Sequence, residues 1–358
     1  MNVRRRRISG IAVAAATALG LTTLSACGDG SAAADNTGNT DKFDVVASFY
    51  PMAFLAEQIG GEHVNVTNLV EPGQEPHDLE ISAKQTAQLQ ESDAAVYLKG
   101  LQPSVDEAIA QSGVKTKIDA TTLTSLEVHG TEEGGHDHGH EEEHAAGDEH
   151  GHGTEDERGH EGEHAAEEQH AAEDDHGHDH GEALDGKDPH IWLDPVKYAE
   201  VAEGVGKAFE KADPDHAADY KKNTAALVGK LEALNTEFAD GLKNTEGKVF
   251  ITSHAAFGHL AERYGLTQEA INGLSPESEP SAARIKELQQ TAEADGVTTV
   301  FYETLVSDKT AKTLATDTNL RTDVLDPIEG ITDRSRGDDY FQVMEANLEA
   351  LQKALGAE

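Results

Sequence analysis

The stretch DPDHAADYKKNTAALVGKLEALNTEFADGLKN, residues 213–244, predicts one long helix in the middle of the chain. Its core-facing positions recur every three or four residues, which places them along one side of the helix. They are Tyr220, Thr224, Leu227, Leu231, Leu234, Phe238 and Leu242. Asp213 followed by Pro214 is typical of a helix start, because a carboxylate caps free amides and proline fits the first turn. At about 1.5 Å per residue this helix is roughly 45 Å long, enough to span two lobes.

Strands alternate with helices on both sides of this helix, which predicts an α/β fold with mainly parallel sheets. The strand candidates before the helix are residues 44–48, 64–68 and 94–98, and those after it are 249–252, 298–302 and 322–325. We therefore expect two α/β lobes connected by the helix. The expected boundaries are 43–212 for the N-terminal lobe, 213–245 for the linking helix and 246–358 for the C-terminal lobe.

The first 27 residues have the pattern of an export signal. Arg4–Arg7 form a basic start, Ile8–Leu24 form a short apolar stretch, and small residues follow. The chain has one cysteine, Cys27, and the preceding Leu-Ser-Ala resembles a bacterial lipoprotein cleavage site. We expect residues 1–27 to be a lipoprotein signal peptide, Cys27 to carry a lipid anchor, and residues 28–42 to be a flexible tether. An ordinary cleaved signal and twin-arginine export are the alternatives.

A His-rich, acidic run begins at His129 and continues to about residue 187. It contains HDHGH at 136–140 and HGHDH at 176–180, and it has too few apolar residues to form a core. The formal charge of the chain is −40, and residues 127–182 hold 21 Asp or Glu and one Arg, so about half of that charge lies here. This charge argues against nucleic-acid binding and against a polybasic membrane patch. We expect a disordered loop that binds divalent metal ions through its imidazoles.

Three histidines outside the run are candidate ligands of one metal ion. His77 follows a strand and a Gly/Pro-rich loop, His190 lies in DPHIWLDP at 188–195, and His254 follows the strand candidate 249–252. Ligands of open α/β sheets bind beyond the carboxyl ends of strands, so we expect these imidazoles to meet in a cleft between the lobes. Zinc takes four such ligands in a tetrahedron. Asp326, after the last strand candidate, is the expected fourth ligand, and Glu303 is its rival.

The remaining Asp and His residues are expected either to support the metal ligands or to have no part in the metal site. Asp78 and Asp194 are hypothesised to orient ligand imidazoles by hydrogen bonds. His63, His216 and His259 lack a comparable setting, and we expect them to be structural or exposed. With only Cys27 available, the sequence excludes a disulfide within the chain and a cysteine-based zinc site.

Residues 43–358 resemble the zinc-specific solute-binding proteins of bacterial ABC importers, a family that also contains manganese binders. The resemblance rests on EPGQEPHD at 71–78, DPHIWLDP at 188–195, SHAAFGHLAERYGL at 253–266, SPESEPSAARIKEL at 275–288 and VLDPIEG at 324–330. It implies two α/β lobes joined by a rigid helix, with Zn2+ held between them by His77, His190, His254 and a carboxylate at Asp326. Manganese binders generally have Glu in place of His254, and the nitrogen here favours zinc. The resemblance also implies a monomer outside the cytoplasm, without enzymatic activity, that serves a membrane permease.

Alternative functions stay open at the level of sequence. A zinc hydrolase would keep three histidine ligands and an open water position, but neither HExxH nor a serine nucleophile elbow is present. An adhesive surface lipoprotein, or one that sequesters nickel or copper, is the third class. The His-rich loop is hypothesised to gather zinc and pass it to the tight site, and a passive zinc buffer is the alternative.

Overall fold

The computed structural model describes residues 42–129, 184 and 186–357. The expected signal peptide, the lipid anchor at Cys27, nearly all of the tether and the His-rich run from residue 130 to 183 lie outside this part. The described residues belong to one compact unit.

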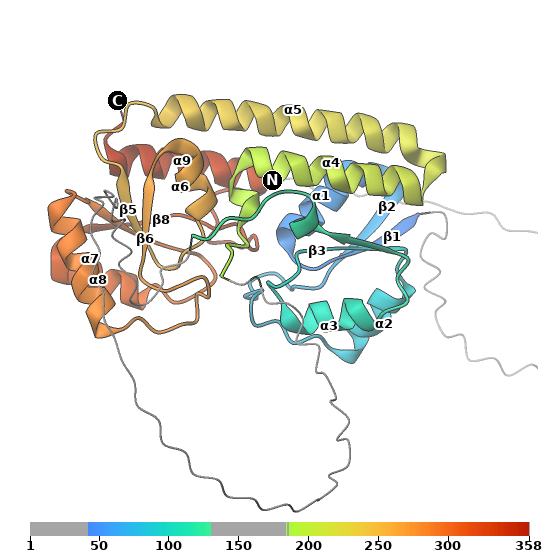
Figure 1. The fold of residues 1–358 in the computed structure, drawn as a ribbon, viewed down its shortest axis with the longest axis horizontal. Helices are drawn as coiled ribbons and strands as arrows, with labels where there is room; N and C mark the ends of the chain where they lie inside the picture. The colour runs from blue at the N-terminus through green and yellow to red at the C-terminus, as the bar shows by residue number, and fades with distance from the viewer. Residues whose placement is uncertain (1–41, 130–183, 185, 358) are drawn as a thin grey trace, which may run out of the picture. The chain divides into compact units, whose positions relative to one another are not determined.

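Two four-stranded parallel sheets with the same strand order form the framework of the described chain (Figure 1). The first sheet has the order β2-β1-β3-β4, with β1 Phe43–Ala47, β2 Val64–Asn68, β3 Ala94–Tyr97 and β4 Thr116–Asp119. The second has the order β6-β5-β7-β8, with β5 Val249–Thr252, β6 Thr267–Ala270, β7 Thr299–Tyr302 and β8 Arg321–Val324. The predicted α/β fold with two mainly parallel sheets is confirmed. The sequence patterns did not predict β4 and β6, which are short, polar edge strands.

Helices connect the strands, and several begin where the sequence supplies a cap. They are α1 Tyr50–Gly60, α2 Ala83–Glu91, α3 Pro103–Gln111, α4 Pro195–Ala212, α5 Ala217–Leu242, α6 Gly258–Tyr264, α7 Ala282–Ala294, α8 Lys309–Thr318 and α9 Tyr340–Leu355. Ser82 and Gln85 form a capping box at the start of α2. Asp194 caps α4, whose first residue is Pro195. Gly265 ends α6 in the left-handed conformation that glycine adopts without strain.

Helix α5 is the long helix that residues 213–244 predict, and its buried face is the predicted one. Its buried residues are Tyr220, Thr224, Leu227, Leu231, Leu234, Phe238 and Leu242. The α-helix begins at Ala217, because Pro214–His216 form a tighter 3-10 turn. The carboxylate of Asp213 accepts hydrogen bonds from His216 and Tyr220 instead of capping the helix. Helix α5 packs along α4 and also contacts α1 and α9, so it touches elements of both lobes (Figure 1).

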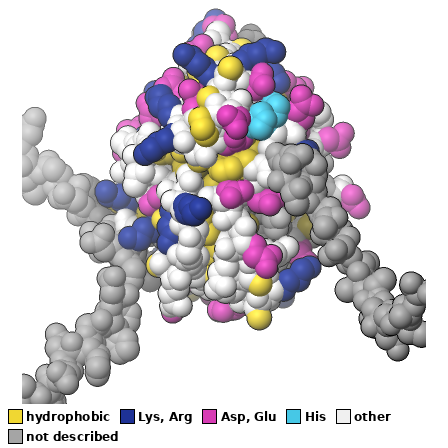
Figure 2. Space-filling model, turned by 90° about the vertical axis from the view of Figure 1, so that its right-hand side faces the viewer, with side chains coloured by type: hydrophobic (Ala, Val, Ile, Leu, Met, Phe, Trp, Pro, Cys, Tyr) yellow, Lys and Arg dark blue, Asp and Glu magenta, His cyan; other side chains and the backbone are white. Residues whose placement is uncertain are grey.

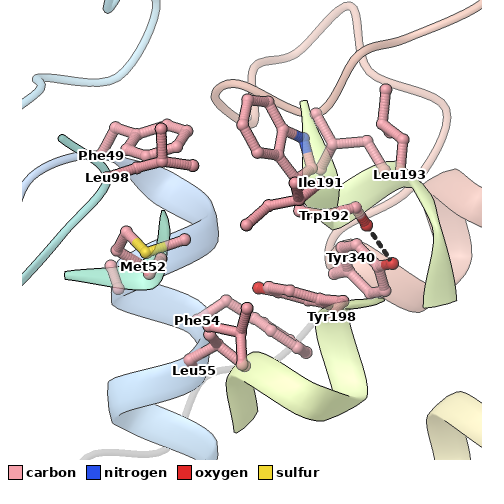
Figure 3. Close-up of a cluster of buried hydrophobic side chains, with 14 of the residues drawn as sticks. Phe49, Met52, Phe54, Leu55, Leu98, Ile191, Trp192, Leu193, Tyr198 and Tyr340 are labelled. Carbon is pink, nitrogen blue, oxygen red and sulfur yellow. Dashed lines mark hydrogen bonds between the residues drawn. The ribbon is translucent and has the colours of Figure 1, made fainter. Parts of the chain in front are cut away.

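One hydrophobic core joins the two lobes around Trp192 (Figure 3), and a second, smaller core lies within the C-terminal lobe. Trp192 is fully buried in the 3-10 turn Ile191–Leu193 and packs edge-on against Phe49 of the first lobe. Its indole N–H donates to the carbonyl of Pro327, and Tyr340 of α9 donates to the Trp192 carbonyl at 2.6 Å. Trp192, two residues after His190, is therefore hydrogen-bonded to both Pro327 and Tyr340 of α9. This junction determines where the His190 ring lies.

The folded surface carries charges of both signs. Figure 2 shows Lys and Arg side chains scattered among Asp and Glu side chains on one side of the molecule. No helix in the described ranges is both long enough and apolar enough to cross a membrane.

Candidate metal centre

Four side chains that are distant in the sequence converge at one point: His77, His190, His254 and Glu329. One potential ligand atom from each lies within 4.8 Å of the others. Oε1 of Glu329 is 3.1 Å from Nε2 of His77, 3.3 Å from Nε2 of His190 and 3.5 Å from Nε2 of His254. Ligand atoms bound to tetrahedral zinc at about 2.0–2.1 Å lie roughly 3.3 Å apart. The separations from Glu329 therefore match the edges of a zinc coordination tetrahedron.

Two of the imidazoles are oriented by buried carboxylates. Asp188 accepts a hydrogen bond from Nδ1 of His190 at 2.7 Å and a second from the His190 backbone N–H at 2.9 Å. Glu303 accepts a hydrogen bond from Nδ1 of His254 at 2.8 Å. A proton on Nδ1 leaves the lone pair on Nε2, which is the atom that faces Glu329. These two carboxylates thus select the tautomer that binds a metal ion.

The centre is buried, and some of its polar atoms have no hydrogen-bond partner. His190, His254 and Glu329 are each at most 1 % exposed, whereas the His77 side chain is 11 % exposed. Among the described residues, Nε2 of His190, Nε2 of His254 and Oε2 of Glu329 find no hydrogen-bond partner. Buried polar atoms without partners are costly, and three of them in one place are typical of a site that binds an ion. Of the four side chains, His77 is the most exposed to solvent.

The buried groups of the centre shift one another's pKa values: Glu329 favours the charged imidazoles of its neighbours, and these favour the charged carboxylate of Glu329. Burial opposes the ionisation of Glu329, but the neighbouring His77, His190 and His254 hold its pKa well below the usual value. Burial also opposes protonation of His254, yet the charges of Glu303 and Glu329 raise the pKa of His254 well above the usual value. Hydrogen bonds to Asp188 likewise raise the pKa of His190 against the effect of burial. Without a metal ion, protons on the imidazoles of His190 and His254 supply the positive charge that stabilises the Glu329 carboxylate.

Each ligand group is positioned by the end of a different structural element. His77 lies in the loop after β2, which turns at Gly73 with a φ of +83° that favours glycine. His190 precedes the 3-10 turn Ile191–Leu193, and His254 follows β5 by two residues. Glu329 follows β8 by five residues. The prediction that His77, His190 and His254 lie close together agrees with this arrangement.

Asp326, the fourth ligand expected from the sequence, is not in the group that the structure brings together. Its carboxylate accepts hydrogen bonds from the Ile328 backbone N–H at 2.8 Å and from the Thr304 hydroxyl at 3.1 Å. Asn347 bonds both the N–H and the carbonyl of Asp326. Ile328 has a φ of 58°, which is strained for a β-branched residue. Asp326 thus holds the tight turn that directs Glu329 toward the imidazoles.

Sequence reasoning missed Glu329 although the quoted motif VLDPIEG contains it. Asp326 is the carboxylate nearest the end of the strand, and the positive φ of Ile328 that brings Glu329 inward leaves no pattern in the sequence. Glu303, the rival ligand, orients His254. The hypothesis for Asp194 is wrong, because its carboxylate caps α4 and pairs with Arg263. No described hydrogen bond joins the Asp78 carboxylate to an imidazole.

None of the other histidines in the described ranges belongs to this group. The rings of His63 and His216 stack at 4.1 Å and bond Asp219 and Asp213 respectively, as structural residues do. His259 is buried, and it belongs to a separate cluster with His129 and Glu262.

The sequence profile of the family "ZnuA: Zinc-uptake complex component A periplasmic" matches residues 45–354, which is most of the chain. The chain belongs to this ZnuA family. Its members are solute-binding transport components, which are not enzymes. The predicted relationship to zinc-specific solute-binding proteins of ABC importers is thereby confirmed, and the family places the protein outside the cytoplasm.

Relatives in the ZnuA family differ in length. The high-affinity zinc uptake system protein ZnuA of Bacillus subtilis is 33% identical over 356 residues, which cover 98% of this chain and 98% of that protein. The zinc-binding lipoprotein AdcA of Streptococcus pneumoniae is 34% identical over 323 residues. That match covers 88% of this chain and 56% of AdcA, so the chain spans about half the length of these longer relatives.

A solved structure from the same family gives the same fold. The Zn(II)-bound ZnuA-like domain of S. pneumoniae AdcA superimposes with a TM-score of 0.64 at 30% identity. The match covers 88% of this chain and 99% of that domain.

Proposed function

We propose that this protein captures Zn2+ outside the cytoplasm and delivers it to the permease of an ABC importer. The proposed ligands are His77, His190, His254 and Glu329, with Glu329 in the place first expected for Asp326. The observation that carries the proposal is the approach of three imidazole nitrogens to one carboxylate oxygen at 3.1, 3.3 and 3.5 Å. Zinc is the cargo of this site.

The ligand set favours zinc over manganese. Three imidazole nitrogens and one carboxylate suit zinc, whereas manganese prefers sites rich in oxygen. One carboxylate with three neutral imidazoles also leaves the bound ion with a net charge near +1. Asp188 and Glu303 accept hydrogen bonds from the coordinating rings and lower the effective charge further. Such a site supplies four protein ligands, so a tetrahedral zinc ion needs no additional water ligand.

The proposed ligands come from both lobes, and this suggests how zinc is captured and released. His77 and His190 belong to the expected N-terminal lobe, while His254 and Glu329 belong to the expected C-terminal lobe. Separating the lobes by a small rotation breaks the tetrahedron, because two ligands leave with each lobe. A pocket beside His77 is lined by Leu101 from one lobe and by Leu274 and Ser275 from the other. We infer that zinc enters and leaves through this pocket when the permease opens it.

The remaining organisation of the chain is part of the same proposal. Cys27 carries a lipid that anchors the protein to the outer face of the cytoplasmic membrane, and residues 28–42 form the tether. The His-rich run gathers zinc near the cleft and raises its local concentration. The expected boundaries, between residues 212 and 213 and between residues 245 and 246, separate the two lobes from the helix that connects them.

Competition titration of the full chain tests the function. Zinc affinity is measured against a chromophoric chelator, for the native chain and for Glu329→Gln and Asp326→Asn. We expect the native chain to hold zinc under conditions where an excess of manganese does not displace it. Glu329→Gln removes a charged ligand and should weaken zinc binding by two or more orders of magnitude, while Asp326→Asn should weaken it less. Equal affinity for manganese, or unchanged zinc affinity in Glu329→Gln, would contradict the proposal.

A further inference from the structure

Among the described residues, Lys197 is the lysine that the fold buries. It lies in the first turn of α4, three residues after Asp194, which caps that helix, and 7 % of the residue is exposed. Lysine normally keeps its ammonium group in water, because burying an unpaired charge costs much free energy. The function proposed above gives this side chain no role. Its contacts therefore indicate what the buried charge is for.

The ammonium group of Lys197 is bound by one short segment, residues 125–127. Its Nζ donates to the backbone carbonyl and to the hydroxyl of Ser125, both at 2.9 Å, and pairs with Oε2 of Glu127 at 2.7 Å. The Ser125 hydroxyl donates in turn to Oε1 of Glu127 at 2.8 Å. Burial opposes the ionisation of Glu127, but Lys197 and Ser125 lower its pKa, so the ion pair is intact near neutral pH. Lys197 thus fixes both the backbone and the carboxylate of this segment.

Glu127 is connected in turn to the metal centre. Its backbone carbonyl accepts a hydrogen bond from the Asp188 N–H at 2.8 Å. Asp188 is fully buried, and its Oδ1 accepts a hydrogen bond from Nδ1 of His190 at 2.7 Å. The Asp188 carbonyl is held from the C-terminal lobe as well, by a hydrogen bond from His259 at 2.9 Å. A continuous set of contacts therefore runs from Lys197 through Glu127 and Asp188 to a proposed zinc ligand.

Other contacts hold the residues just before this segment on α4. The Thr124 hydroxyl donates to the Glu200 carboxylate. A Cβ atom at Gly204 would lie 2.6 Å from the methyl carbons of Leu123, so glycine leaves the room that Leu123 occupies. Neither contact involves the buried ammonium group. We therefore expect Leu123 and Thr124 to stay on α4 when that group is removed, and the disturbance to be confined to residues 125–127.

We propose that Lys197 is a positioning residue of the metal centre, which fixes Asp188 through Glu127 and thereby fixes the ring of His190. The proposal rests on the function proposed above, because the orientation of His190 matters only if that ring binds Zn2+. Two simpler roles predict other results. A lysine that only anchors residues 125–127 to α4 affects stability without affecting the zinc affinity of the folded chain. A lysine that acts only through its charge repels Zn2+, so removing the charge would tighten zinc binding.

Competition titration of the full chain with a chromophoric chelator distinguishes these roles. The chelator is kept in excess over the chain, so that zinc held weakly elsewhere does not contribute. The compared variants are Lys197→Met, Glu127→Gln, Asp188→Asn, and Asp188→Asn combined with each of the first two. Lys207→Met is the matched control, because Lys207 carries the same charge on the same helix but is exposed and pairs with Glu203 at 3.1 Å.

Lys197→Met should weaken zinc binding about tenfold although it removes a positive charge, a loss at the lower end of the range for groups behind a metal-binding histidine. Glu127→Gln should weaken zinc binding as well, and Lys207→Met should leave it unchanged. In the Asp188→Asn background, Lys197→Met or Glu127→Gln should weaken binding by less than about twofold more, because the connection to His190 is already cut.

Unchanged or tighter zinc binding in either Lys197→Met or Glu127→Gln would overturn the proposal, and so would losses that add fully to that of Asp188→Asn. Circular dichroism checks that each variant is folded. If Lys197→Met does not fold, Glu127→Gln carries the test, because the Glu127 side chain is 37 % exposed and tolerates substitution. Failure of the native chain to hold zinc against the chelator would instead contradict the function proposed above, so the two failures are distinguishable.

Discussion

Glu303 accepts a hydrogen bond from Nδ1 of His254 at 2.8 Å, and both side chains are almost fully buried. This pair determines which nitrogen of His254 faces the metal centre. Ser253 donates to the same oxygen of Glu303 at 2.7 Å and holds the carboxylate in place. The Asp188–His190 pair repeats the arrangement on the other lobe. The two imidazoles are therefore oriented in the metal-free chain, so the proposed zinc site needs little reorganisation on binding.

Replacing Glu303 with Gln should weaken zinc binding by roughly ten- to a hundredfold, the range typical when a hydrogen-bond partner of a metal-binding histidine is changed. The amide keeps the size of the side chain but removes the negative charge behind His254. Titration against a competing chelator measures the change. Glu279→Gln alters an exposed residue and should have no effect. An affinity equal to that of the native chain in Glu303→Gln would show that the pair does not support the ligand.

Replacing Asp326 with Ala should lower the free energy of unfolding by about 1–3 kcal/mol, because the buried N–H of Ile328 and the hydroxyl of Thr304 lose their acceptor. Zinc affinity should also fall, since the turn that directs Glu329 loosens. Denaturant unfolding and chelator competition measure the two effects. Asp333→Ala, at an exposed position nearby, is the control. A large loss of zinc affinity with full stability would indicate that Asp326 is a direct ligand.

Replacing Tyr340 with Phe should destabilise the metal-free protein by about 1–2 kcal/mol, because the buried carbonyl of Trp192 loses its donor. Tyr302→Phe is the matched control, since the Tyr302 side chain is only partly buried. Thermal unfolding followed by circular dichroism measures both variants. Because Trp192 lies two residues after His190, Tyr340→Phe should also weaken zinc binding modestly. Identical stability of the two variants would contradict the role of this junction.

The metal-free protein should lose stability as the pH rises above about 6.5. His190 and His254 have raised pKa values when folded, so their contribution is complete below the unfolded value of about 6.5 and is lost as pH rises through the folded values. Glu329 has a lowered pKa, so its contribution is complete above about 4.3 and is lost as pH falls through the folded value. These three groups therefore stabilise the metal-free fold most between about pH 4.3 and 6.5. Thermal melts of the chelator-treated protein at pH values below, within and above this range measure the effect.

Zinc affinity should change with pH in the opposite direction. Zinc binds neutral imidazole, so it must displace the protons held by His190 and His254, and affinity should rise as pH rises. Calorimetry in buffers with different ionisation enthalpies counts the released protons. The number should decrease once the pH exceeds the folded pKa values. The thermal stabilisation given by a fixed excess of zinc should consequently grow with pH. Zinc binding without proton release near neutral pH would contradict this account.

The sequence alone determined the α/β class, the buried face of α5 and the three histidines of the centre. These features depend on local chemistry: the helical spacing from Tyr220 to Leu242 and histidines placed just after strands are visible in one dimension. The family resemblance rested on motifs of the same kind.

Only the tertiary structure decided the fourth group, the orienting carboxylates and the second cluster. Glu329 reaches the imidazoles because Ile328 adopts a positive φ held by Asp326, and backbone conformation of this kind is not encoded in residue type. Glu303 meets His254 from 49 residues away, and Glu262 meets His129 from 133 residues away. Contacts over such separations depend on how strands and helices pack, so neither composition nor spacing predicts them.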